Sequence, residues 1–332
     1  MAECDDDGLS ADCPALVYAY AITNSVGRPL DWGAVCAGDQ TCDFTWVHLN
    51  ANSAEAQDFV RARPYIPKAA ADALLAVETR PRATRIGNGF SINLRGVNHN
   101  PGAAPDDLVS LRVWVDDRHV ITARRRTVRA IQDLSAMIER PGGPATPGAL
   151  VAYLAASINT NMEPFVEETI DEIDQIEDLL LENEDRNIRR KLADARRTAV
   201  QLRRYIAPQR EAIVMLAASE HPIFDTESRI VLRETANTVM RMTEEIDAAR
   251  ERATIFYDEL TDQRAQEMTR NTLILSTVAA VFLPLQFIVG LLGANVGGIP
   301  GAQNPAAFWI VSLVCLTIGA LMLGFFKSRD WL

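Results

Sequence analysis

Two long apolar segments near the carboxyl end constrain this chain more than any other feature. They run from Leu273 to Leu292 and from Ala306 to Phe326, and neither contains Asp, Glu, Lys, Arg or His. A helix of about 20 apolar residues is long enough to cross the hydrocarbon core of a bilayer. The sequence therefore predicts two membrane-spanning helices, residues 273–292 and 306–326, joined by an uncharged, glycine-rich loop at 293–305.

Basic residues beside the two spans indicate their orientation. Arg264 and Arg270 precede the first span, Lys327 and Arg329 follow the second, and the loop between them has no Lys or Arg. Because cytoplasmic flanks carry the excess of basic residues, we expect both chain termini in the cytoplasm and the loop outside. The first residues are acidic and contain no apolar run, so we expect no signal peptide.

The chain has 332 residues, a net charge of −11 and a pI near 5.0. This acidity argues against nucleic acid as a partner. An acidic cytoplasmic surface would concentrate cations near a membrane, but it would equally serve solubility alone. The charge therefore leaves both interpretations open.

The first part of the chain has the pattern of a mixed α/β domain. A helix is predicted at Ala69–Glu78, and a Pro/Gly-rich segment, Pro141–Pro147, ends this part. We predict an α/β domain over residues 1–145. Its predicted strands are Val17–Thr23, Thr45–Leu49, Phe90–Val97, Val109–Val115 and Val120–Ala123. The last two are expected to form a hairpin.

Helical sequence follows over residues 146–270. Glu163–Asp185 holds eleven acidic residues and no basic one, with apolar residues at helical spacing, and Asn187–Gln209 is rich in arginine. The two blocks would attract each other or complementary neighbours, or would form solvated surfaces. From Glu227 no proline or glycine interrupts the chain until Pro284. Apolar residues at spacings of three and four form a coiled-coil-like stripe along this helix. They are Leu232, Ala236, Val239, Met242, Ile246, Ala249, Ala253, Phe256 and Leu260.

The fold class expected from these patterns is α+β with a membrane part. It comprises the α/β domain, a long helical stalk at 146–270 and a transmembrane hairpin at 271–332. The stalk is expected to continue without a break into the first span.

One face of the first span is small or weakly polar. In a lone hairpin, such a face would mark tight helix packing in lipid. Continuity with the stalk instead favours a symmetric bundle in which several copies enclose a path. Stepping back from Asn295 by threes and fours, the residues of this face are Gly290, Gln286, Leu283, Ala279, Leu275 and Thr272.

The absence of charge in both spans bears on what such a path would carry. A bare divalent ion would find no carboxylate to replace its water, and desolvating it would be very costly. A cation would therefore pass largely hydrated. Asn295, just after the first span, can offer its amide oxygen to the ion's water shell.

These residues resemble the CorA superfamily of divalent-cation transporters, which carry a Gly-x-Asn signature after the first of two C-terminal spans. Here the signature reads Gly293-Ala294-Asn295, preceded by Leu283–Ile288, which looks like the family's pore helix. The loop GANVGGIPG and the segments Glu78–Arg82, Leu94–Gly102 and Leu202–Glu211 are similar to the ZntB branch, associated with zinc.

The resemblance implies a homopentamer in a bacterial inner membrane, with a cytoplasmic funnel and a ring of Asn295 at the outer mouth. It implies Zn²⁺ as the main cargo, with Mg²⁺, Co²⁺, Ni²⁺ and Cd²⁺ as further candidates, and no resident cofactor. Two departures stand out. Position 294 is Ala, where magnesium-type members have Met, and none of the four histidines lies in a span.

Proton coupling has been proposed for the family, yet neither span contains an ionisable residue. Asp258 and Asp262 on the stalk are the candidates for a coupling or metal-binding group, and ordinary exposed salt-bridging residues are the alternative. The direction of transport stays open.

Three other functions compete with zinc transport. The first is a magnesium and cobalt channel of CorA type, and the second is a membrane-anchored signalling or scaffold protein. An enzyme is the least supported, because the sequence has no Gly-x-Ser-x-Gly elbow, no Walker-type loop and no His-Glu-x-x-His pair.

Overall fold

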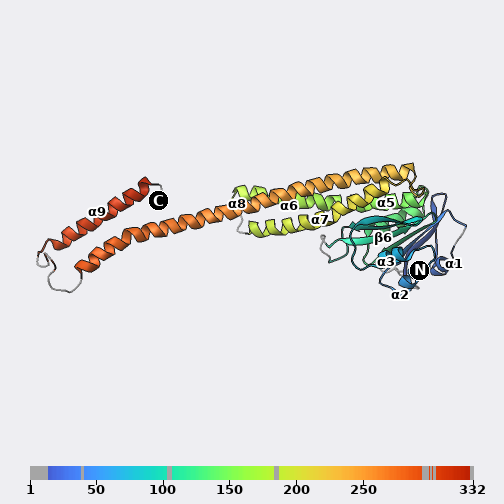
Figure 1. Ribbon diagram of the computed structural model, residues 1–332, viewed down its shortest axis with the longest axis horizontal. Coiled ribbons are helices and arrows are strands. Elements are labelled where there is room, and N and C mark those ends of the chain that lie inside the picture. The colour runs from blue at the N-terminus through green and yellow to red at the C-terminus, as the bar shows by residue number, and fades with distance from the viewer. Residues whose placement is uncertain are drawn as a thin grey trace. The chain divides into compact units, whose positions relative to one another are not determined.

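The computed structural model describes residues 14–38, 41–102, 107–182, 187–293, 299, 301 and 304–329, with the backbone alone at 180–182. The chain divides into two compact units, Met1–Thr254 and Ile255–Leu332. Figure 1 shows a sheet with helices in the first unit and two helices in the second.

Among the described residues, seven strands form one sheet in the order β2-β1-β3-β7-β6-β5-β4. Neighbouring strands are antiparallel except β3 and β7, which are parallel and pair from Thr45 with His119 to Asn50 with Arg124. Strands β3, β7 and β5 therefore run the same way and end at the same edge. The strands are β1 (Leu16–Thr23), β2 (Val26–Pro29), β3 (Phe44–Asn50), β4 (Arg82–Ile86), β5 (Gly89–Gly96), β6 (Val109–Val115) and β7 (His119–Arg124).

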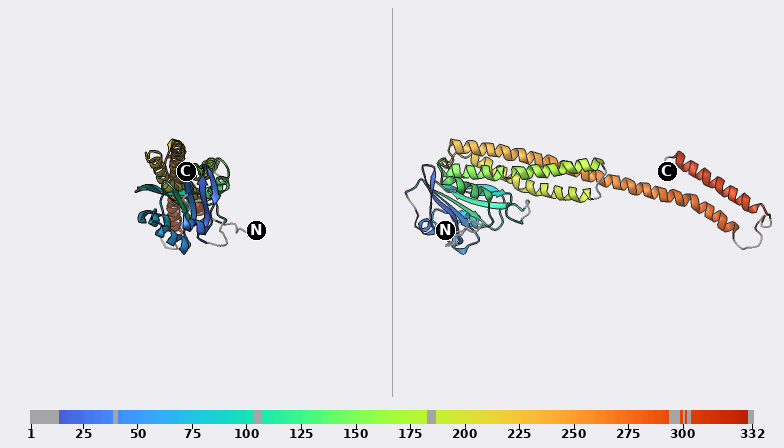
Figure 2. Two further views of the ribbon diagram at one scale, coloured as in Figure 1. Left: turned by 90° about the vertical axis from the view of Figure 1, so that its right-hand side faces the viewer. Right: turned by 180° about the vertical axis from the view of Figure 1, so that it is seen from behind.

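Helices cover both faces of the sheet, as Figure 2 shows. On one face, Leu49, Trp114 and Ile121 form a buried core with residues of α2 and α3. Helices α5 and α7 contact strands β4, β5 and β6 from the other side. The helices up to this point are α1 (Trp32–Ala37), α2 (Ala54–Ala62), α3 (Lys68–Leu75), α4 (Arg129–Ile138) and α5 (Pro147–Thr160).

The α/β class predicted for this part is confirmed, and each of the five predicted strands is present. The short strands β2 and β4 and the helices α1, α2 and α4 were not predicted. Helix α3 ends at Leu75, three residues earlier than expected. The reason is tertiary: buried Arg112 donates from Nε to the carbonyl of Ala76 and from Nη2 to that of Val77, both at 3.1 Å. These bonds hold the chain extended where the helix would continue.

Three long helices follow: α6 (Glu163–Glu182), α7 (Ile188–Ala217) and α8 (Thr226–Leu292). Asp225 precedes α8, and its Oδ1 accepts from the N–H of Ser228 at 2.8 Å, as an N-cap does. The apolar stripe predicted for α8 is buried from Leu232 to Ala253, while Phe256 and Leu260 are half-buried. In α6 the buried stripe is Val166, Thr169, Ile173 and Ile176.

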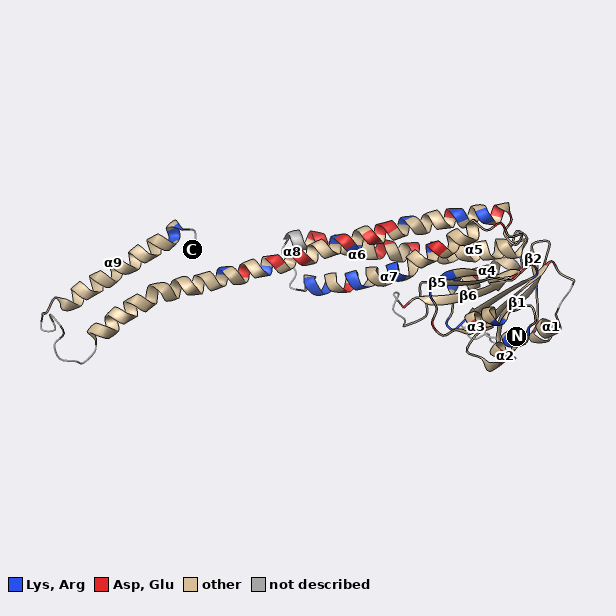
Figure 3. Cartoon of the chain, viewed as in Figure 1, with Lys and Arg blue, Asp and Glu red and all other residues tan. Residues whose placement is uncertain are grey.

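Ion pairs join α8 to its neighbours within the first unit. Arg241 pairs with Glu163 of α6, and Arg252 Nη2 lies 2.8 Å from Asp174 Oδ1. In α7, Arg203 Nε lies 2.8 Å from Asp247 Oδ1 of α8. The acidic block of α6 thus meets arginines of α8 as well as solvent (Figure 3). All six side chains are partly exposed, so each pair contributes at most about 1 kcal/mol.

Candidate functional site

The second unit contains the end of α8 and helix α9 (Ala307–Ser328). Both helices are long and apolar enough to cross a bilayer. Their large apolar side chains are mostly uncovered: Leu283 of α8 is 67% exposed and Leu316 of α9 is 72% exposed. Water would be an unfavourable neighbour for so much apolar surface, so lipid or further copies of the chain must cover it.

One face of α8 contacts α9. Thr277 and Val281 are buried, and Leu285 and Ile288 are half-buried, at spacings that place all four on one side of the helix. Leu285 Cδ1 lies 3.8 Å from the position that a Cβ would occupy on Gly319 of α9. This face is therefore the one that the hairpin itself covers.

The six residues expected from the sequence to line a path lie on the other side of α8. At about 100° per residue they share an arc of about 80°, whose centre lies about 170° from the face that contacts α9. All six are exposed, so the structure brings them together on the surface that α9 leaves open. They are Thr272, Leu275, Ala279, Leu283, Gln286 and Gly290.

Hydroxyl groups near the start of this strip have a defined orientation. Thr272 Oγ1 donates to the carbonyl of Met268 at 2.8 Å, and Thr261 and Thr269 donate in the same way to the carbonyls four residues earlier. Because the helix backbone takes each hydroxyl proton, the oxygen lone pairs stay available as acceptors. Acceptor oxygens are what the water shell of a cation requires.

The Gly-x-Asn signature is described only at its first residue. Gly293 is exposed, and its N–H donates to the carbonyl of Val289 at 2.8 Å, which makes it a continuation of the last turn of α8. Ala294 and Asn295 lie outside the described residues. Their part in a filter stays a prediction.

Asp258 and Asp262 are both exposed on α8, one turn apart. Among the described residues, no group of three or more His, Cys, Asp or Glu side chains could hold a metal ion. The structure therefore brings no third ligand of these types to the two aspartates, and a metal site there is still a prediction.

A second, polar site lies in the first unit, and we did not predict it from the sequence. A pocket of about 560 Å³ opens at the edge of the sheet where β3, β5 and β7 end. Its lining includes Asn98 and Asn100, from a segment singled out only through family resemblance, and Arg124, Arg125 and Arg126. The run of three arginines that follows the predicted strand Val120–Ala123 is the sequence signal for it.

Comparison with known proteins places the whole chain in a family. Residues 42–328 match the family model described as CorA-like Mg2+ transporter protein. The chain is 33% identical to "Divalent cation transporter CmaX" of Pseudomonas aeruginosa, covering 97% of this chain and 98% of that protein. It is 31% identical to "Zinc transport protein ZntB" of Yersinia pseudotuberculosis, covering 98% and 99%.

Solved structures agree with the described fold. The structure of full-length CmaX, at 33% identity, has a TM-score of 0.82 and matches over 97% of this chain and all of that one. The CorA magnesium transporter of Methanocaldococcus jannaschii, at 20% identity, has a TM-score of 0.77 and shares the fold. The expectation of a membrane transporter rather than an enzyme is confirmed by these matches: the chain belongs to the CorA-like Mg2+ transporter protein family.

Proposed function

We propose that the protein moves divalent cations across a bacterial inner membrane and that Zn²⁺ is its main cargo. The observation that carries this proposal is the near full-length similarity to proteins named for zinc and divalent cation transport. The exposed strip of α8 supplies a surface on which such transport would occur, because it is small, uncharged and not covered by α9.

The path forms when several copies of the chain assemble. The strip of one chain forms only one side of a path. Two helices per chain cannot enclose water, so a ring of copies is required. We place five copies in the ring, with Thr272 near the cytoplasmic end of the path and Asn295 at the outer mouth. The termini then lie in the cytoplasm, in accord with the basic residues that flank both spans.

The cation passes with most of its water. The six strip residues include no carboxylate or imidazole, and the oxygens of Thr272 and Gln286 can accept hydrogen bonds from coordinated water. At the outer mouth, a ring of Asn295 amides selects the ion through its hydration shell. Ala294 leaves more space behind this ring than a longer side chain would.

The test measures zinc entry into proteoliposomes that contain a zinc-sensitive dye. Asn295→Ala should reduce Zn²⁺ flux at least tenfold or make it non-selective while the oligomer, counted by native mass spectrometry, stays intact. Gln303→Ala, which removes a carboxamide from the same loop outside the signature, should keep wild-type flux. Wild-type protein that assembles correctly but moves no divalent metal under any gradient would refute the proposal and favour a membrane-anchored scaffold.

Magnesium is the second candidate cargo, because the matching family model and a structural relative are both named for Mg²⁺. Parallel assays with a magnesium dye, and with Co²⁺, Ni²⁺ and Cd²⁺ as competitors, rank the cations. Mg²⁺ flux that exceeds Zn²⁺ flux at equal gradients would reassign the main cargo.

Coupling to protons would require a titratable group outside the charge-free spans. Asp258 and Asp262 are exposed on α8. At about 100° per residue Asp258 lies about 60° from the centre of the strip, whereas Glu267 lies about 120° from it, so Asp258 is the first candidate. Asp258→Ala should change the dependence of Zn²⁺ flux on an imposed pH gradient, whereas Glu267→Ala, an exposed carboxylate further along the same helix, should not. Flux that is the same for Asp258→Ala and wild type at every pH gradient would exclude this role.

A further inference from the structure

The pocket at the sheet edge, which we call the Asn98 pocket, is made by the ends of three strands that run the same way. Asn50 is the last residue of β3, Arg124 is the last residue of β7, and Asn98 follows the end of β5 by two residues. Open α/β sheets bind ligands in the crevice outside the carboxyl ends of their strands. The volume of about 560 Å³ lies within the range of small-molecule sites, which is about 300–1,000 Å³.

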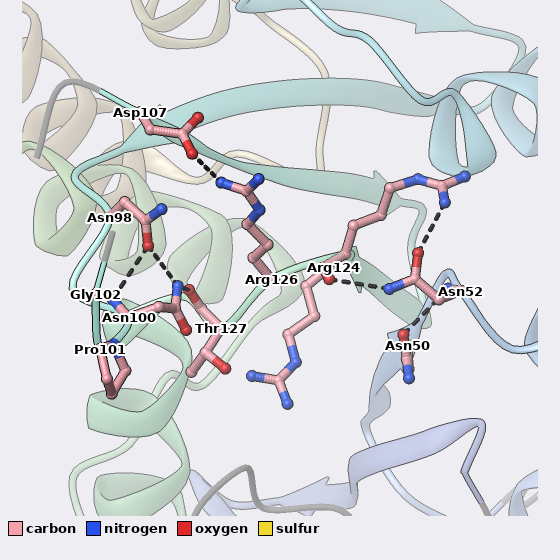
Figure 4. A pocket seen from close by; sticks show the side chains of 11 residues that line it. Asn50, Asn52, Asn98, Asn100, Pro101, Gly102, Asp107, Arg124, Arg126 and Thr127 are labelled. Atoms are coloured by element: carbon pink, nitrogen blue, oxygen red, sulfur yellow. Dashed lines mark hydrogen bonds and ion pairs between the residues drawn. The ribbon is translucent and has the colours of Figure 1, made fainter. Parts of the chain in front are cut away.

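Asn98 presents a buried donor that has no partner in the described part of the chain. Its side chain is only 4% exposed, and its Oδ1 accepts from the backbone N–H of Asn100 at 3.1 Å and from the Asn100 amide. Because the backbone N–H can only donate, the acceptor role of Oδ1 is fixed. Nδ2 of Asn98 is buried and makes no hydrogen bond to any described residue, although buried polar atoms are usually paired. Figure 4 shows Asn98 on the same pocket wall as Asp107 and Arg126.

Arginines line the same pocket as this donor. Among the described lining residues, three consecutive guanidinium groups stand against one carboxylate, that of Asp107, which pairs with Arg126. Guanidinium groups stay ionised at any physiological pH. Arg125 is held in place by bonds from Nη1 to Asn52 Oδ1 at 2.8 Å and from Nη2 to the carbonyl of Leu75 at 2.9 Å. The pocket thus carries a surplus of positive charge in a chain whose net charge is −11.

We infer that the Asn98 pocket binds a small organic polyanion with at least two phosphate or carboxylate groups. Guanidinium forks pair with either kind of oxyanion, and the Asn98 Nδ2 donor adds a neutral hydrogen bond at the buried end. No aromatic side chain belongs to the described lining, so a nucleotide base would find no ring to stack on. The Asn100 amide donates from Nδ2 to Asn98 Oδ1 and to the carbonyl of Thr127, and its Oδ1 can accept a hydrogen bond from a hydroxyl group, which favours a sugar phosphate or a hydroxy-polycarboxylate. This site is independent of the membrane path.

Isothermal titration calorimetry on the full-length protein in detergent tests the inference. The buffer is depleted of metal by a chelating resin, and the probes are sodium pyrophosphate and sodium citrate, with sodium gluconate as a monoanionic control. We expect saturable binding of one pyrophosphate or citrate per chain and no saturable binding of gluconate. Binding of pyrophosphate alone assigns phosphate groups, binding of citrate alone assigns carboxylates, and binding of both assigns recognition by charge.

Two variants test the site itself. Asn98→Asp keeps the oxygen that Asn100 requires and replaces the free donor with a carboxylate oxygen, so affinity should fall at least tenfold. Arg126→Gln changes a partly exposed side chain with little risk to folding and should also weaken binding at least tenfold. Arg82→Gln removes the same charge from an exposed site on β4 and should bind like wild type. Absence of saturable binding in wild type, or wild-type affinity in both pocket variants, would overturn the inference.

Discussion

Gln209 of α7 donates from Nε2 to Oδ1 of Asn159 in α5 at 2.8 Å, and both side chains are fully buried. Gln209 Oε1 also accepts the backbone N–H of Arg95 in β5 at 2.7 Å. Asn159 Nδ2 completes the chain of bonds by donating to the carbonyl of Ala155 at 2.6 Å. Two helices and a strand are thus joined through two amide side chains whose polar atoms all have partners.

Replacing Gln209 should therefore be costly. Gln209→Leu leaves the Arg95 N–H and Asn159 Oδ1 buried without partners, and each unpaired group costs about 1–3 kcal/mol. We expect a loss of about 2–6 kcal/mol in the free energy of unfolding, measured by denaturant titration followed by the tryptophan fluorescence of the first unit. Gln201→Leu, at a half-buried position on the same helix, should change stability by less than about 0.5 kcal/mol. Equal losses for the two variants would contradict the importance of this network.

A close backbone contact should make position 148 intolerant of any side chain. A Cβ on Gly148, in the first turn of α5, would lie 2.0 Å from the carbonyl oxygen of Ile223. Since a backbone atom cannot move aside easily, Gly148→Ala should cost more than about 2 kcal/mol and lower the melting temperature. Gly33→Ala is the matched control, because its nearest neighbour, Asp31 Oδ1, is 3.4 Å away. A melting temperature that Gly148→Ala leaves unchanged would show that the loop before α8 can relax.

His48 should make the protein less stable in mild acid. Its ring is fully buried, with Nδ1 2.8 Å from Thr122 Oγ1, and burial together with the positive charge of Arg124 holds its pKa well below 6.5. The unfolded chain therefore binds more protons than the folded one as pH falls below 6.5, and stability falls with it. One such group accounts for a loss of about 1.4 kcal/mol between pH 7.5 and pH 5.5.

His48→Gln should remove this part of the pH dependence, seen as a smaller change in melting temperature between pH 7.5 and pH 5.5. His99→Gln, which changes an exposed histidine, should keep the wild-type change. The assignment to His48 fails if its variant loses as much stability in acid as wild type does.

A bulky side chain on the open strip of α8 should block transport. In a ring of chains, Ala279→Trp would place an indole in the path from every copy, so Zn²⁺ flux in proteoliposomes should fall at least tenfold. Leu316→Trp adds the same group to an exposed position of α9 and should leave flux within about twofold of wild type, because position 316 lies outside the proposed path. If Leu316→Trp blocks transport and Ala279→Trp does not, the path follows α9 instead.

Much of this architecture follows from local sequence patterns. The strands of the α/β domain and the stripe from Leu232 to Ala253 follow from side-chain periodicity along one element, and the two spans follow from the length of their apolar runs. The strip from Thr272 to Gly290 was likewise found by counting along the helix, whereas the Gly-x-Asn signature was found by resemblance to a family. Family membership rests on such patterns taken over nearly the whole chain, and the matches to known proteins confirm it.

Tertiary structure decided the rest, because it depends on which distant segments meet. The parallel pairing of β3 with β7 brings Asn50 beside Arg124, and β5 adds Asn98 at the same edge, so the Asn98 pocket exists only after the sheet forms. The bond from Gln209 to Asn159 joins residues fifty positions apart. Which side of α8 faces α9 was also not predicted, because the contact of Leu285 with Gly319 depends on how the two helices pack. Periodicity records whether a residue is buried, but the identity of its neighbours is set by chain topology.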